Sequence, residues 1–307
     1  MDGAGKALGG TGEGETAAPF VLTVPESLPV PILIAVPHAG RDYPEAVTAA
    51  MRDPAWGAAR LEDRYADLLG EAVAEATGAG LLVARAPRAM IDLNRAPDDV
   101  DWSMIAGGSV RRAPHSAANR RARSGLGLVP RRLPGLGEVW RQRLPAAELE
   151  QRIETVHRPY HRALGATLER LRDRWGAALL IDLHSMPPLR ASQQGEGAEF
   201  VLGDRFGASC APALSALVMQ RLGALDRRVA HNRPYSGGFG LDHHAAPRRG
   251  LHALQIEVCR AAYLDAQLDK PGPRLAAVTR TLVAVVRALA HEVAAIGDPG
   301  RFRHAAE

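Results

Sequence analysis

Short apolar runs alternate with longer amphipathic stretches from Phe20 almost to the end of the chain. The apolar runs have the length of strands and end in glycine, proline or polar residues, which is typical of strands buried on both faces. Strands that alternate with helices favour an α/β fold with a mainly parallel or mixed central sheet flanked by helices. The predicted strands are residues 30–36, 80–85, 177–183, 199–202 and 252–258, and the predicted helical stretches are 60–76, 147–175 and 264–296, the last interrupted by Pro-Gly-Pro at 271–273.

Segments that lack this alternation of apolar and amphipathic stretches indicate the domain organisation. The first 18 residues have almost no large apolar side chain, so we expect 1–18 to be a disordered tail. No clear linker divides the rest, and we expect 19–307 to form a single domain. Residues 98–143 are rich in arginine, glycine and proline and are too long for an ordinary connection. We expect this segment to be an inserted lid or an exposed arm.

Composition excludes several classes of protein. The chain has 46% apolar and 23% charged residues, which is ordinary for a soluble globular protein. No apolar run approaches the length of a membrane span, and the N-terminus lacks the apolar core of a secretory signal. We therefore expect a cytoplasmic protein with no membrane partner. Only Cys210 and Cys259 are cysteines, so a metal site would need histidine and carboxylate ligands.

The positive charge is built almost entirely from arginine. The net charge is +4, and Lys6 and Lys270 are the only lysines among 38 basic side chains. A coding bias explains this composition, but the planar guanidinium also suits recognition of phosphate or carboxylate groups.

Chemically capable side chains stand at the ends of three predicted strands. His38 follows the first of these strands, His184 follows the third, and Glu257 lies near the end of the last. In open α/β sheets, ligands bind at the carboxyl ends of strands, and neutral imidazoles placed there are good zinc ligands. A carboxylate within an apolar run is costly to bury unless it is paired or used. Glu257 is therefore a candidate general base beside a metal-bound water, or a structural ion-pair partner of Arg260 or another arginine.

A third metal ligand should be a carboxylate. Glu62 and Asp63 open the predicted helix over 60–76, close enough in sequence to return to the loop that carries His38. Asp67 would lie one turn later on the same helical face as Asp63. The acidic start of a helix also complements the macrodipole without any metal. Ser185 follows His184, but no nucleophile elbow surrounds it, so we do not expect a serine nucleophile.

A polar cluster follows the second predicted strand. Arg88, Asn94 and Arg95 offer donors suited to a substrate carboxylate or to a developing oxyanion. Arginines in such a position are equally often solvated surface residues.

Several short motifs resemble, in order, those of the N-formylglutamate amidohydrolase family. The most specific are the I-D-L-N-R of residues 91–95 and the D-L-H-S-M-P of residues 182–187. The resembling stretches together cover about residues 30 to 265. The looser ones lie at residues 37–44, 62–68, 125–130, 157–161, 202–205, 233–238 and 254–264.

The resemblance implies a metal-dependent amidohydrolase with a fold similar to the zinc carboxypeptidases, of the phosphorylase/hydrolase-like type. It also implies hydrolysis of N-formyl-L-glutamate to formate and L-glutamate, the last step of one route of histidine breakdown. One Zn²⁺ per chain, or another divalent metal, would be held by His38, Asp63 and His184. Arg41 stands where carboxypeptidases carry their acidic ligand, three residues after the histidine, so the acid must come from elsewhere. Asp63 is the expected ligand, with Glu62 and Asp67 as alternatives.

By the same resemblance, Asn94 and Arg95 are similar to the pair that grips a substrate carboxylate in carboxypeptidases. Arg88 is a further expected substrate contact, Arg95 is also a candidate for stabilising the oxyanion, and Glu257 is similar to the catalytic base. The expected partner is a small N-acyl amino acid. The alternative is a zinc-dependent deacylase or carboxypeptidase-like enzyme that acts on another N-acyl amino acid or on a peptide.

No nucleic-acid partner is expected. The arginine-rich residues 111–143 contain Trp140 as their only aromatic side chain, too few for base stacking. The sequence leaves the oligomeric state open.

Overall fold

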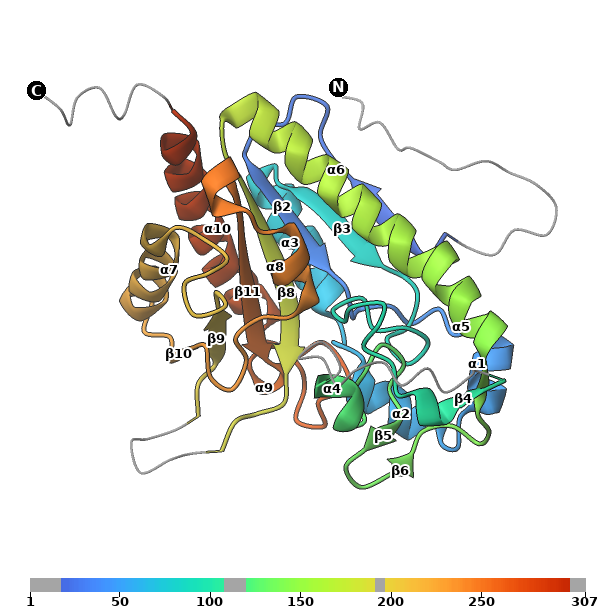
Figure 1. Cartoon of the computed structure of the whole chain (residues 1–307). Helices are drawn as coiled ribbons and strands as arrows, with labels where there is room; N and C mark the ends of the chain where they lie inside the picture. The colour runs from blue at the N-terminus through green and yellow to red at the C-terminus, as the bar shows by residue number, and fades with distance from the viewer. Residues whose placement is uncertain (1–17, 108–119, 191–196, 299–307) are drawn as a thin grey trace, which may run out of the picture.

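The computed structural model describes residues 18–107, 120–190 and 197–298. A seven-stranded mixed sheet runs through its centre (Figure 1). Strands β3, β2, β8 and β11 are parallel neighbours, β1 is antiparallel to β3, and β9 and β10 run opposite to β11. The α/β fold with a mixed sheet is therefore confirmed. In spatial order the strands are β1 (Phe20–Thr23), β3 (Gly80–Ala84), β2 (Ile32–Val36), β8 (Ala178–Met186), β11 (Leu251–Cys259), β9 (Phe200–Gly203) and β10 (Val229–His231).

The central strands are apolar on both faces because each face is covered by helices. In β8, Leu179, Ile181 and Leu183 belong to the core on one side of the sheet. Ala178 and Leu180 belong to the core on the other side. The same alternation in β2 and β11 explains why their sequences are continuous apolar runs rather than alternating ones.

Two layers of helices enclose the sheet (Figure 1). One face packs against α3 (Ala66–Thr77), α7 (Pro212–Ala224) and α10 (Leu275–Gly297). The other packs against α5 (Ala146–Arg152), α6 (Arg158–Trp175) and α8 (Phe239–His244). A π-helical turn, η3 (Ile153–His157), joins α5 to α6. The smaller elements are α1 (Glu45–Ala50), α2 (Pro54–Leu61), η1 (Trp102–Met104), β4 (Ile105–Ala106), α4 (Arg120–Arg123), β5 (Arg132–Leu133), β6 (Gly137–Glu138), β7 (Leu144–Pro145), η4 (Pro247–Arg249) and α9 (Arg260–Tyr263).

The predicted helix over 60–76 is wrong at its start. α2 ends at Leu61, α3 begins at Ala66, and Tyr65 between them has the left-handed φ of 57°. Asp63 lies in this break, where its backbone N–H donates to the carbonyl of His38 over 2.8 Å. This long-range hydrogen bond, which no sequence period reveals, brings Asp63 to the end of β2. Asp63 and Asp67 therefore do not share a helical face.

The predicted helical stretch over 264–296 is also shorter than expected. α10 begins at Leu275, after the Pro-Gly-Pro, and the residues between α9 and α10 form turns and a single bridge between Leu264 and Pro271.

The described parts of residues 98–143 pack against the domain. Val100, Met104, Leu128 and Trp140 are buried in the core that also includes α6. Within the same segment, Arg131 forms ion pairs with Asp101 and Glu138 at 2.8 and 3.0 Å. These described residues are therefore part of the folded domain. Arg111 and Arg112 of this segment lie outside the described residues, as do residues 1–17 of the predicted tail.

Within the ranges that the structure describes, no helix combines the length and the apolar character needed to cross a bilayer.

Candidate active site

The register of β8 and β11 gathers four polar side chains at one end of the sheet. Glu257 pairs with His184, and Gln255 pairs with Asp182. Because side chains alternate along a strand, all four project from the face covered by α6 and α8, opposite to Leu183. All four are buried. The carboxyl ends of these two strands thus form the polar floor of a cavity.

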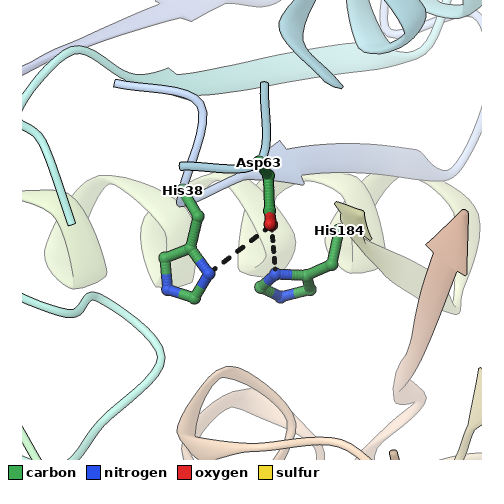
Figure 2. A group of neighbouring side chains, drawn as sticks. All are labelled: His38, Asp63 and His184. Atoms are coloured by element: carbon green, nitrogen blue, oxygen red, sulfur yellow. Dashed lines mark hydrogen bonds and ion pairs between the residues drawn. The ribbon is translucent and has the colours of Figure 1, made fainter. Parts of the chain in front are cut away.

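His184 of this floor meets His38 and Asp63, which come from the segments after β2 and α2 (Figure 2). The Asp63 Oδ2 atom lies 3.0 Å from Nδ1 of His184 and 3.5 Å from Nδ1 of His38. One possible ligand atom from each residue lies within 4.8 Å of the others, and all three side chains are buried. The three predicted ligands are therefore brought together in a group that could hold a metal ion.

The outer nitrogens of both histidines face carboxylates. Nε2 of His38 lies 2.7 Å from Asp92 Oδ1, and Nε2 of His184 lies 3.0 Å from Asp182 Oδ2. An ionised carboxylate only accepts hydrogen bonds, so Asp92 keeps the proton of His38 on Nε2. Nδ1 of His38 is buried without a hydrogen-bond partner, which leaves its lone pair for a cation. Carboxylates behind metal-binding histidines are the usual arrangement in such centres, so these residues fit a divalent metal.

The charges around the group keep its carboxylates ionised and favour the protonated form of His184. Burial alone would raise the pKa of Asp92, but the guanidinium groups of Arg88 and Arg95 hold it well below its usual range. Burial likewise opposes the ionisation of Asp63, and both histidines outweigh it, so the pKa of Asp63 is also low. Burial would lower the pKa of His184, but the neighbouring carboxylates of Asp182 and Asp63 raise it well above its usual value. A metal ion bound here would therefore displace a proton.

Asp92 and Asp182 were not predicted as site residues from the sequence. Each is a carboxylate placed within or beside an apolar strand-like run, next to residues that were selected. Burying either carboxylate is as costly as burying Glu257 unless it is paired or used, so the same signal could have identified both.

The other two candidate acids point elsewhere. Asp67 accepts two hydrogen bonds from the guanidinium of Arg41, at 3.1 and 2.5 Å. Glu62 lies 3.8 Å from Arg64. Of the three acids named from the sequence, only Asp63 lies between the histidines.

Glu257 lies beside the candidate metal group and is buried at the wall of the cavity. Its carboxylate accepts a hydrogen bond of 2.8 Å from the Gln255 amide, and burial raises its pKa to about 7. Arg260 instead donates to Ser185 Oγ at 3.1 Å and to the carbonyls of Ala59 and Glu62. No ion pair between Arg260 and Glu257 is present among the residues that the structure describes.

The cavity over these groups has a volume of about 220 Å³ and a strongly basic wall. Arg88 donates to Asp92 at 2.9 Å, and Arg95 donates to the carbonyls of Leu126 and Asn94 at 2.9 and 2.6 Å. Two further lining arginines were not singled out from the sequence: Arg60 from α2, and Arg121 from the arginine-rich segment. The arginines that line the cavity are Arg60, Arg88, Arg95, Arg121 and Arg260.

Asn94 bridges several elements at the cavity wall. Its Nδ2 atom donates to Gln255 Oε1 over 3.3 Å and lies 3.3 Å from Nε2 of His184. Its Oδ1 atom accepts the backbone N–H of Gly240 over 2.9 Å. The amide that was expected to contact substrate is thus also held against a candidate metal ligand.

Comparison with known proteins adds a second line of evidence. The family model of N-formylglutamate amidohydrolase matches residues 30–264. The N-formylglutamate deformylase of Pseudomonas aeruginosa is 32% identical over 283 residues, covering 87% of this chain and 94% of that protein. The deformylase of Pseudomonas putida is 32% identical over 248 residues, covering 77% of this chain and 82% of that protein.

Solved structures agree with this match. The N-formylglutamate amidohydrolase of Ralstonia eutropha superposes with a TM-score of 0.80 at 32% identity, covering 90% of this chain and 98% of the other. A gene product of Agrobacterium tumefaciens, at 17% identity, shares the fold with a TM-score of 0.64, covering 90% of this chain and 96% of that one.

Proposed function

This chain belongs to the N-formylglutamate amidohydrolase family, and we propose that it hydrolyses N-formyl-L-glutamate to formate and L-glutamate with a divalent metal, Zn²⁺ in the first instance. The observation that carries the proposal is the carboxylate of Asp63 between two buried histidines whose outer nitrogens face Asp92 and Asp182. His38, Asp63 and His184 would hold the metal. When bound, such an ion lowers the pKa of a water molecule and polarises a carbonyl group.

The residues around the metal site supply the proton transfers. Glu257, with its pKa near 7, accepts a proton from the attacking water as the new C–O bond forms at the formyl carbon. It then delivers that proton to the amide nitrogen as the C–N bond breaks, which releases formate and the free amine of glutamate. Burial keeps Glu257 poised between its two protonation states, as a group that both accepts and donates must be.

The basic wall of the cavity supports recognition of a dianionic amino acid. Arg88 and Arg95 are fixed by Asp92 and by backbone carbonyls, so their remaining N–H groups are oriented before substrate arrives. Guanidinium groups bind carboxylates in a planar, two-point geometry. Arg95 and Asn94 would hold the glutamate carboxylates with Arg88, and an arginine at this wall would also stabilise the negative charge that develops on the formyl oxygen.

The test is formate release from N-formyl-L-glutamate by chelator-stripped protein, with and without added Zn²⁺. We expect no turnover in the stripped protein and restored turnover on adding metal. Folded protein that rebinds metal but releases no formate would reject this substrate. A panel of other N-acyl amino acids and a peptide C-terminus, assayed in parallel, would then identify the related deacylase activity.

A further inference from the structure

The turn at residues 92–95 is held from behind by two histidines of the neighbouring helical run. Nε2 of His157 lies 2.8 Å from the carbonyl oxygen of Arg95, and Nε2 of His161 lies 2.9 Å from that of Leu93. A carbonyl only accepts hydrogen bonds, so both imidazoles donate through Nε2. The two bonds fix the backbone on either side of Asn94.

A third histidine orients His161. Because Nε2 of His161 carries the proton, its Nδ1 accepts the Nε2–H of His244 over 2.9 Å. The planes of the two rings are within 19° of parallel, and their centroids lie 5.2 Å apart. Burial lowers the pKa of His161 to about 2 and that of His244 to about 3, so both stay neutral. Both hydrogen bonds therefore have a fixed direction: His244 donates to His161, and His161 donates to the carbonyl of Leu93.

Local helix geometry places both donors on the same side. His157 ends the π-helical turn η3, and His161 lies four residues later in α6, so their side chains project together. Most other buried positions of α6 are apolar, including Leu164 and Leu168, and pack on the core. π-helical turns inside α-helices are frequent at functional sites.

The position of Asn94 leaves little room for movement of the turn. Its amide is bound by Gly240 N–H and Gln255 and lies against His184. The loop after β10 also approaches it closely: a Cβ atom on Gly238 would lie only 2.5 Å from Asn94 Oδ1. A shift of the turn would therefore displace the Asn94 amide from all of its partners.

We propose that His157 and His161 are positioning residues for hydrolysis, because they hold the turn that aims Asn94 at His184 and Arg95 at the cavity. The inference rests on the proposed function for its kinetic consequence. Neither histidine reaches the reacting atoms itself. Each histidine fixes the backbone beside Asn94 and Arg95, which are the proposed substrate contacts.

The test compares two substitutions at each histidine in the metal-loaded enzyme. His157→Leu and His161→Leu remove the donor, whereas His157→Gln and His161→Gln keep an N–H at a similar reach. His243→Leu is the matched control, because His243 stacks on Phe239 with centroids 4.8 Å apart and, within the described residues, makes no hydrogen bond to the turn. The readouts are kcat and KM for N-formyl-L-glutamate, metal content, and amide hydrogen exchange at Gly240.

We expect each leucine variant to retain metal, to lose about tenfold in kcat/KM mainly through KM, and to exchange the Gly240 amide about tenfold faster, the scale of one lost hydrogen bond. The glutamine variants and His243→Leu should stay near the wild type. Equal losses in the leucine and glutamine variants, or unchanged Gly240 exchange in the leucine variants, would overturn the proposal. Gly240 exchange needs no substrate, so it decides the positioning role even if the wild type fails to release formate.

Discussion

Each histidine of the candidate metal group uses its two nitrogens for different purposes. Nδ1 faces Asp63, and Nε2 faces a second carboxylate, Asp92 for His38 and Asp182 for His184. Among the described residues, Asp63 and the two histidines are the candidate ligands, because the other two carboxylates lie behind the imidazole rings. The residues that set the tautomers are thus as much a part of the site as the ligands.

Replacing Glu257 with glutamine should separate catalysis from metal binding. Glutamine keeps the shape of the side chain but cannot accept the proton from water, so kcat should fall by a factor of ~10²–10⁴. Metal content should stay at the wild-type level, because Glu257 is not among the three candidate ligands. Steady-state kinetics with metal analysis checks both. Near-normal turnover would remove Glu257 from the mechanism.

The activity should depend on pH through the same carboxyl group. Burial raises the pKa of Glu257 to about 7, and only the ionised form can act as the base. A bound divalent cation nearby favours the ionised carboxylate, so in the metal-loaded enzyme we expect kcat/KM to fall roughly tenfold per pH unit below an apparent pKa under about 7 and to level off above it. A pH profile measured at saturating metal tests this. A flat profile across the same range would contradict it, and the residual activity of Glu257→Gln should lack this acidic limb.

A site residue could be predicted from the sequence where its position in the fold depends on the local sequence alone. His38, His184 and Glu257 could be found because each stands at the end of an apolar strand, and such ends converge in a parallel sheet. Asp63 could be named from the sequence only as one of three acids, together with Glu62 and Asp67. Its position depends on a backbone bond to His38 and on the left-handed Tyr65, which a helical period does not encode.

Among the secondary-structure elements, the buried strands could be predicted from local sequence, whereas helix ends depend on long-range contacts. The five predicted strands coincide with β2, β3, β8, β9 and β11 to within a few residues, because burial on both faces leaves an unbroken apolar signature. The antiparallel β1 and the short β10 lie at the two ends of the sheet and carry no such signature. The predicted helix boundaries were wrong where tertiary contacts end a helix, as between α2 and α3.

The central strand β8 should tolerate little loss of volume. Leu180 is fully buried in the core beneath α6. Leu180→Ala should lower the free energy of unfolding by about 2–5 kcal/mol, because it loses apolar burial and leaves a cavity. Leu225→Ala, at an exposed position after α7, should change it by less than about 0.5 kcal/mol. Urea denaturation of both variants gives the comparison, and equal effects would contradict the assigned core.

For the molecule as a whole, metal binding and folding should be coupled. An ion held by His38, Asp63 and His184 binds the native state and stabilises it by mass action. Removing the metal with a chelator should lower the melting temperature, and adding Zn²⁺ should restore it. His184→Ala should melt at the same temperature with or without chelator. Stoichiometric zinc in that variant would overturn the ligand assignment.

The order in which the chain is synthesised gives the position of β8 a consequence for biogenesis. β2 and β8 are neighbours in the sheet, yet all of residues 37–177 are made between them. His38 and Asp63 leave the ribosome long before His184, and pairing of such distant segments is slow because a long loop must close first. The three candidate ligands can therefore meet only after residue 184 has been made and the long loop between β2 and β8 has closed, so a metal ion would stabilise the fold late and would not nucleate it.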